Sequence, residues 1–363
     1  MNIPISKPII EDEELKAVND VLTSGLLVQG EHVAQLEQQF KELCKAKHAL
    51  AVTNGTTALH IALIGLDLKP GDEVITTPFS FVATVNSILL TGAKPVLVDI
   101  EEDSFNINPD LIEEKITENT KAILAVNLYG QTANYTKINE IAKKYNLVVI
   151  EDAAQSIGAE HKGTPSGSAG NMACFSLYAT KNVMSGEGGM VTTDSDDVYN
   201  RMLLFRQHGM DGKNKYVYHS IGHNYRMTNI HAAIGIEQMK KLERFTNRRR
   251  EIAGLYDEAF KDLSKLSIPV ANDDNYHVYH QYTLTINDDK QTFIDYLDEN
   301  EIGYGIFYPK PLHMVSHISK IGYTEGDFPI AEKVADMVVS IPVHPALTQS
   351  EVDYIIEKIT NYD

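Results

Sequence analysis

Short apolar runs alternate with periodic segments between residues 50 and 195. The apolar runs are predicted strands, at residues 50–53, 73–77, 95–99, 122–127, 147–151, 173–177 and 189–193. Between the first five, apolar residues recur every three or four positions, which predicts helices over residues 57–66, 81–91, 109–116 and 135–145. Residues 147–150 are apolar at every position, as in a strand buried on both faces of a sheet. The alternation predicts an α/β fold with a mainly parallel central sheet and helices on both faces.

The pattern changes after residue 228. A long helical pattern over residues 229–260, bent or broken near Phe245, leads into a mixed segment. That segment is predicted to contain strands at 281–286 and 303–307 and helices at 291–299, 330–337 and 349–359. Two amphipathic helices precede residue 45, and Gly25 is the expected C-cap of the first. We therefore expect a large α/β domain over residues 1–245 and a smaller α+β domain over residues 246–363.

Composition restricts the class of protein. The 363 residues are 43% apolar and 23% charged, as in a globular protein with more than one small core. No apolar run approaches the roughly 18 residues of a membrane span, and the first 14 residues lack a secretory pattern. Only two cysteines, Cys44 and Cys174, are present, which favours a reducing, cytoplasmic location. A net charge of −18 argues against a nucleic-acid partner, and the basic run 248–250 is expected to be a solvated helix face.

Two strand ends carry candidate binding residues, because ligands of open α/β sheets bind beyond the carboxyl ends of the strands. The first predicted strand leads through residues 54–57 (Asn-Gly-Thr-Thr) into a helix. Free N–H groups and hydroxyls at such a place can hold an anion, although the same residues can be an ordinary N-cap. The strand at 147–151 leads into Asp152, whose carboxylate can reach a ligand or cap the next helix.

A third strand end carries Lys181. This lysine follows the strand at 173–177 and precedes a glycine-rich turn at 186–189. Burial makes an ammonium costly, lowers the pKa of the lysine and makes its amine nucleophilic, which suits Schiff-base chemistry. Taken alone, a lysine here is most simply a surface residue. Together, the three strand ends favour one ligand site.

Six motifs resemble those of the DegT/DnrJ/StrS family of nucleotide-sugar aminotransferases and occur in that family's order over nearly the whole chain. They are Asn54-Gly55-Thr56-Thr57-Ala58-Leu59, Gly71-Asp72-Glu73-Val74-Ile75, Glu151-Asp152-Ala153-Ala154-Gln155, Phe175-Ser176-Leu177-Tyr178-Ala179-Thr180-Lys181-Asn182 with Gly186-Glu187-Gly188-Gly189, Gly222-His223-Asn224-Tyr225-Arg226-Met227 and Tyr308-Pro309-Lys310-Pro311-Leu312-His313. The resemblance implies a fold-type I enzyme that uses pyridoxal 5'-phosphate (PLP), a homodimer with sites at the subunit interface, and a nucleotide-linked keto-sugar as amino acceptor.

The resemblance also implies a role for each candidate residue. Lys181 would hold PLP as a Schiff base and move a proton between substrate and cofactor carbons, and Asp152 would keep the pyridinium nitrogen protonated. The other cofactor contacts would be Thr56, Thr57 and Ser176 to the phosphate, Phe81 to the ring face, Gln155 to the phenolic oxygen, and Asn224 to the phosphate of the neighbouring subunit's cofactor. Substrate contacts would be Tyr178, Tyr308 and His313, the last two facing the sugar, and Arg226, to a diphosphate or the donor's carboxylate. Phe81 could instead be a core aromatic, and Arg226, Tyr308 and His313 ordinary loop or interface residues.

Two local features qualify this assignment. Asn127 stands where many family members have His, which weakens any role at that position and leaves the cofactor site intact. The histidines 277, 280, 313 and 317 lack a carboxylate or thiolate partner at ligand spacing, so no metal site is expected.

These features predict a ping-pong transaminase (EC 2.6.1 type). By resemblance, L-glutamate would load the cofactor, and a nucleotide-linked 3-keto or 4-keto hexose would take the amine, in amino-sugar, O-antigen or other glycan biosynthesis. A sugar 3-dehydrase of the same fold has His in place of the cofactor lysine, whereas Lys181 is present. A PLP-binding regulator would carry a basic helix-turn-helix module, and a NAD-dependent sugar enzyme a Gly-x-Gly-x-x-Gly turn after a strand; the sequence shows neither.

Overall fold

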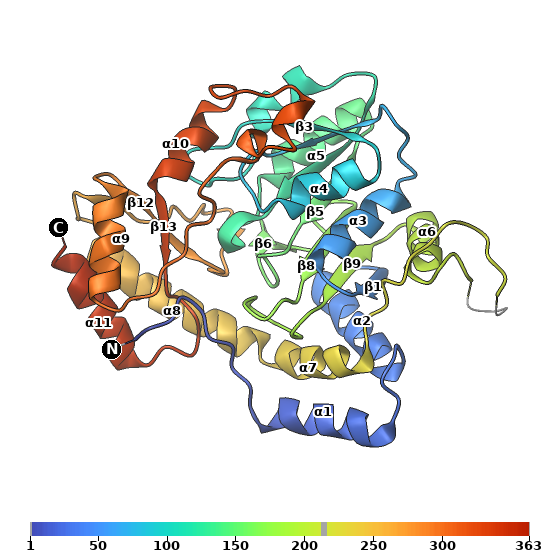
Figure 1. Ribbon diagram of the computed structural model, residues 1–363, viewed down its shortest axis with the longest axis horizontal. Helices are drawn as coiled ribbons and strands as arrows, with labels where there is room; N and C mark the ends of the chain where they lie inside the picture. Colours follow the sequence, from blue (N-terminus) through green and yellow to red (C-terminus); the bar gives the residue numbers. More distant parts are fainter. Residues whose placement is uncertain (1, 212–215, 363) are drawn as a thin grey trace.

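The computed structural model describes residues 2–211 and 216–362 (Figure 1). In these residues the largest sheet has seven strands in the order β1-β9-β8-β5-β4-β2-β3. Its strands are β1 (His48–Val52), β2 (Glu73–Thr76), β3 (Lys94–Leu97), β4 (Thr120–Val126), β5 (Val148–Asp152), β8 (Met172–Ser176) and β9 (Gly189–Thr193). Neighbouring strands from β3 to β8 are parallel, and β9 is antiparallel to both β8 and β1. The predicted, mainly parallel sheet is confirmed.

Helices cover both faces of this sheet because alternate residues of a strand point to opposite faces. On β1, Leu50 and Val52 pack with helix α3, whereas Ala49 and Ala51 pack with α2 and α7. The helices up to residue 240 are α1 (Asp12–Ser24), α2 (Glu31–Cys44), α3 (Gly55–Gly65), α4 (Ala83–Leu90), α5 (Tyr135–Tyr145), α6 (Asp196–Arg206) and α7 (Asn229–Lys240). Gly25 is the left-handed C-cap of α1, as predicted. No helix in the described part of the chain is long and apolar enough to cross a membrane.

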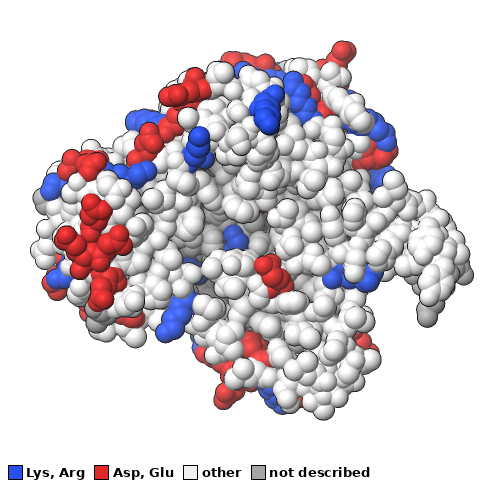
Figure 2. Space-filling view, in the orientation of Figure 1, with Lys and Arg blue, Asp and Glu red and all other residues white. Residues whose placement is uncertain are grey.

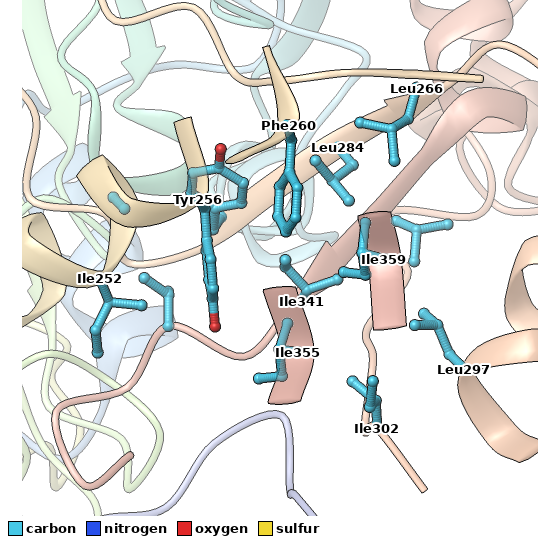
Figure 3. Packing of buried hydrophobic residues seen from close by; sticks show 14 of the residues in the cluster. Ile252, Tyr256, Phe260, Leu266, Leu284, Leu297, Ile302, Ile341, Ile355 and Ile359 are labelled. Atoms are coloured by element: carbon cyan, nitrogen blue, oxygen red, sulfur yellow. The ribbon is translucent and has the colours of Figure 1, made fainter. Parts of the chain in front are cut away.

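The C-terminal part packs around helix α8 (Leu242–Phe260). Ile252, Tyr256 and Phe260 of α8 lie in one core with Ile355 and Ile359 of α11 (Figure 3). The remaining elements here are β10 (Leu266–Ser267), β12 (Tyr282–Ile286), α9 (Lys290–Glu299), α10 (Pro329–Met337), β13 (Val338–Ile341) and α11 (Gln349–Thr360), with β10-β12-β13 forming an antiparallel sheet. A third small sheet, of order β11-β6-β7, joins β6 (Glu160–His161), β7 (Thr164–Pro165) and β11 (Asn275–Tyr276).

Three predicted elements differ from the structure. Residues 109–116 form two short 3-10 turns, Pro109–Leu111 and Glu113–Lys115, held by i→i+3 backbone bonds in place of an α-helix. Residues 303–307 make only an isolated bridge, from Gly305 to Ser340 of β13, a strand that the pattern missed. The long helix is interrupted after Lys240, and Phe245 lies buried within α8.

The prediction that the basic run 248–250 is a solvated face is wrong. Arg249 is only 4% exposed, and its Nη1 donates to the carbonyl of Tyr279 at 3.2 Å. Arg250 Nη1 donates to the carbonyl of His277 at 2.6 Å. These bonds attach α8 to the segment that leads from β11 toward the cavity described below.

Asn127, the residue that departs from the family pattern, is a fully buried hydrogen-bonding centre after β4. Its Nδ2 lies 3.1 Å from Ser156 Oγ, 3.2 Å from Ser166 Oγ and 3.3 Å from Glu151 Oε2. Its Oδ1 accepts a hydrogen bond from the Tyr135 hydroxyl at 2.9 Å. Asn127 therefore ties the ends of β4 and β5 to the turn at 166–170.

We expect Asn127→Ala to lower the free energy of unfolding by about 2–4 kcal/mol, because it leaves several buried polar groups without partners. Urea unfolding of the cofactor-free protein measures this loss. Asn119→Ala, which removes an exposed amide from the same domain, is the matched control and should change stability by less than about 0.5 kcal/mol. Equal stability of the two variants would contradict a central role for Asn127.

Candidate active site

A cavity of about 610 Å³ lies at the carboxyl ends of β5 and β8, beside the start of α3. Figure 2 shows this face hollowed near its middle, with a cationic side chain on the floor, in the region where the loop after β8 lies in Figure 1. Eight of the predicted site residues line the cavity: Thr56, Phe81, Asp152, Gln155, Ser176, Tyr178, Lys181 and Tyr308. The structure thus brings together residues that are up to about 250 positions apart in the sequence.

Lys181 lies in the turn after β8, half-buried at the cavity wall. The turn is closed by its own backbone, whose N–H donates to the Tyr178 carbonyl at 2.9 Å. Burial lowers the pKa of Lys181 to about 8, although attraction by Asp152 opposes the change. A large share of neutral amine near neutral pH is what a lysine needs to attack a carbonyl group.

Asp152 ends β5 and is almost fully buried. Its Oδ2 accepts from the Thr84 hydroxyl at 2.8 Å, and its Oδ1 from the Ala154 N–H at 3.3 Å. Burial raises the pKa of Asp152, which these hydrogen bonds and the charge of Lys181 oppose. Asp152 is thus a buried carboxylate that faces the same cavity as Lys181, in a setting that weakens screening by water.

The first turn of α3 lies at one end of the cavity. Asn54 caps the helix, with Oδ1 accepting from the Thr57 N–H at 2.9 Å, and the Thr57 hydroxyl donates to the Asn54 carbonyl at 2.8 Å. Thr57 is thus engaged in the cap and is absent from the cavity wall, whereas Thr56 and Ser176 line it. Gly55 allows this approach, since an added Cβ would lie 2.8 Å from Ser176 Cβ. Unpaired N–H groups of a helix start, with two hydroxyls, suit a phosphate.

Two aromatic rings and an amide form the opposite wall. Gln155 Oε1 accepts from the Tyr129 N–H at 2.7 Å, so its Nε2 is free to donate, and it lies 3.2 Å from the Tyr308 hydroxyl. The ring of Tyr308 lies 6.1 Å from that of Phe81. Phe81 is 55% exposed, so it is a cavity residue and the alternative of a core aromatic does not hold. Burial raises the pKa of Tyr308, which keeps its phenol protonated near neutral pH.

His280 also lines the cavity, which the sequence did not predict. Asn182 donates through Nδ2 to the Val278 carbonyl at 3.1 Å, so its Oδ1 faces His280 Nδ1, also at 3.1 Å. Nδ1 must then carry the proton, which leaves Nε2 as an acceptor. Burial lowers the pKa of His280, as do Lys181 and Arg249, so the ring is neutral. In the sequence, His280 is only a histidine just before a predicted strand, and such residues are too common to indicate a binding site.

Besides Thr57, three predicted residues lie outside the cavity of their own chain. Asn224 is exposed, and its backbone pairs with Gln207. Arg226 lines a separate opening of about 370 Å³ beside the start of α2. His313 lies fully buried in a 3-10 turn, Leu312–Met314, with Nε2 at 2.8 Å from Glu332 Oε1. Among the described residues, no group of three or more His, Cys, Asp or Glu side chains could hold a metal ion.

In the cofactor-free protein, acylation of Lys181 should reach half its maximal rate near pH 8, and not near the 10.5 of an ordinary lysine, because burial favours the neutral amine. Competitive labelling with acetic anhydride, followed by peptide mass spectrometry, measures this, and exposed lysines in the same digest give the reference. Asp152→Asn removes the charge that favours the ammonium and should move the Lys181 midpoint lower. A Lys181 profile equal to that of the exposed lysines would contradict the geometry.

Known proteins resemble this chain over nearly its whole length. The chain matches the DegT/DnrJ/EryC1/StrS aminotransferase family over residues 8–360. It is 41% identical to a pleiotropic regulatory protein of Geobacillus stearothermophilus, over 100% of this chain and 99% of the relative, and 36% identical to a GDP-perosamine synthase of Caulobacter vibrioides, over 98% and 96%. The solved PLP form of Spr1654 from Streptococcus pneumoniae has a TM-score of 0.94 at 29% identity, over 99% of this chain and 98% of that one. The chain therefore belongs to the DegT/DnrJ/EryC1/StrS aminotransferase family.

Proposed function

We propose that this aminotransferase uses PLP and moves the amino group of L-glutamate to the keto group of a nucleotide-linked hexose in amino-sugar biosynthesis. The observation that carries the proposal is the convergence of Lys181, Asp152 and the phosphate-binding start of α3 on one cavity. The PLP form of Spr1654 and the GDP-perosamine synthase among the relatives support the cofactor and the class of acceptor.

The cavity residues fit PLP in charge, shape and donor chemistry. Thr56 and Ser176 would hold the phosphate at the helix start, Lys181 would supply the attaching amine, and Asp152 would face the ring nitrogen. Phe81 would cover one face of the ring. The close approach of Gly55 to Ser176 keeps the cavity narrow at the start of α3, where the phosphate would bind. When bound, PLP supplies an electron sink that stabilises negative charge on the substrate carbon.

Each residue then has a defined task. With PLP bound, the amine of Lys181 would move a proton between the donor's α-carbon and the cofactor carbon. A pKa of about 8 lets its amine accept and donate a proton near neutral pH. Asp152 would hold the positive charge on the ring nitrogen, which is the source of the sink's strength. Gln155 Nε2, fixed by the Tyr129 N–H on the other end of the amide, would donate to the phenolic oxygen.

The proposal includes a homodimer with shared sites. Of the described residues that line the cavity, Lys181 is the only lysine or arginine, so a nucleotide diphosphate needs cationic groups from elsewhere. Arg226 and Asn224 lie outside their own cavity, near an apolar stretch in which Tyr216 is 78% and Ile221 85% exposed. Exposed apolar side chains in one segment are typical of an interface. We infer that this stretch packs on a second copy and presents Asn224 and Arg226 to its cavity.

Borohydride reduction of the PLP-loaded protein should fix the cofactor to the peptide that contains Lys181, because that amine is the one placed in the cavity. Lys181→Ala should still bind PLP through the phosphate end, take no fixed label and lose turnover. Lys310→Ala, a change at an exposed lysine, should be labelled as in the wild type. Peptide mass spectrometry reads the result, and a label on any other peptide would rule out the assignment of Lys181.

Mixing Lys181→Ala chains with Asn224→Asp chains tests the shared site. Each parent should be nearly inactive, the second because a carboxylate would lie against a phosphate. Random reassortment makes half of the dimers mixed, and each mixed dimer has one intact site of two, so activity should return to about a quarter of wild type. If native mass spectrometry shows exchange and no activity returns, Asn224 acts within its own chain.

A further inference from the structure

Two hydroxyl groups from the start of α4 lead to the carboxylate of Asp152. Thr84 Oγ1 lies 2.8 Å from Asp152 Oδ2, and Ser80 Oγ lies 2.9 Å from Thr84 Oγ1. Thr84 is fully buried and Ser80 is 3% exposed, yet both side chains border the cavity. Neither residue belongs to the motifs that the sequence singled out.

The direction of these hydrogen bonds follows from the number of protons available. An ionised carboxylate can only accept, so the single hydroxyl proton of Thr84 goes to Asp152. Ser80 must then donate its own proton to Thr84. Chains of this kind polarise one another, and hydrogen bonds to a charged acceptor are the stronger kind. Both hydroxyl dipoles therefore point toward the negative charge.

Asp152 depends on this donor because little else compensates its charge. The only other hydrogen bond that the described residues give it, from the Ala154 N–H, is longer, at 3.3 Å. Lys181 attracts the carboxylate but forms no ion pair with it at contact distance in the described structure, and a lysine that moves protons is neutral for part of each cycle. Thr84 is thus the one short, permanent donor to the buried carboxylate.

Thr84 is also connected to the ring-binding wall. Its backbone N–H donates to the Phe81 carbonyl at 3.1 Å, and its own carbonyl accepts from the Ser87 hydroxyl at 2.9 Å. Residues 81–84, which lead into α4, therefore connect the hydroxyl that holds Asp152 to the backbone of the aromatic residue that would cover the cofactor ring. This arrangement favours a role in orientation over simple packing.

We propose that Thr84 is a positioning residue for Asp152, whose hydroxyl keeps the carboxylate ionised and directs its remaining lone pairs into the cavity, with Ser80 as the outer donor. The inference rests on the proposed function, since it assigns Asp152 to the ring nitrogen. Loss of the hydroxyl would leave the buried carboxylate easier to protonate, and a protonated carboxyl group cannot hold a positive charge on the ring.

The test compares Thr84→Val, which keeps the shape and removes the donor, with Thr84→Ser, which keeps the donor. Thr84→Val should lower the rate of conversion of bound PLP by L-glutamate roughly 10- to 100-fold, the effect of losing one hydrogen bond to a charged group. The absorbance of bound PLP, measured without substrate, should change at acid pH when the carboxylate of Asp152 takes up a proton. The midpoint of this acid transition should be about one to two pH units higher in Thr84→Val than in wild type. Thr84→Ser should stay within about threefold of wild type in rate, with an unshifted transition.

Asp152→Asn separates failure of this inference from failure of the proposed function. If Asp152→Asn binds PLP and turns over normally, the proposed role of Asp152 is wrong. If Asp152→Asn is impaired while Thr84→Val matches wild type in both rate and acid transition, only the inference about Thr84 is overturned. Should Thr84→Val fail to fold by circular dichroism, Ser80→Ala, which removes the outer donor alone, must move the transition in the same direction; an unshifted transition overturns the inference.

Discussion

The site depends on keeping the amine of Lys181 partly neutral and the carboxylate of Asp152 ionised while both groups face one cavity. Burial favours the neutral form of both groups, lowering the pKa of Lys181 to about 8 and raising that of Asp152. This change suits the lysine, because an amine that attacks a carbonyl must be partly neutral, but it opposes the role of the carboxylate, because a group that holds a ring nitrogen must stay charged. The Thr84 hydroxyl and the Ala154 N–H favour the ionised carboxylate, because both donate hydrogen bonds to Asp152.

The central sheet determines where Asp152 and Lys181 lie relative to each other. Strands β5 and β8 are parallel neighbours, with Asp152 opposite Cys174, so their carboxyl ends emerge side by side. Asp152 ends the first strand, whereas Lys181 follows the second by a short turn. Helix α3 then approaches the end of β8 closely enough that only glycine fits at position 55. One edge of the sheet thus places the acid, the amine and the phosphate end within one cavity.

The strand ends were predictable because buried parallel strands are apolar throughout and the chemistry follows them directly, which revealed Lys181 and Asp152. The direction of each strand was not predictable, because an apolar run has the same pattern in a parallel strand and in the antiparallel strand β9. Thr84 and His280 were missed because they come from a helix and a loop and meet the site only in three dimensions. Arg249 was misjudged because its burial relies on carbonyl groups that the tertiary fold brings to it.

The most direct test of the account is a single turnover in reverse. PLP-loaded protein is mixed with L-glutamate and, separately, with each of a panel of nucleotide-linked 3-amino and 4-amino hexoses, while absorbance follows conversion of the cofactor to its pyridoxamine form and mass spectrometry follows the keto product. The account predicts stoichiometric conversion by L-glutamate and by at least one amino sugar, and none in Lys181→Ala. A protein that holds PLP at Lys181 and converts it with no amino donor would be a cofactor-binding protein without transaminase activity, and would contradict the account.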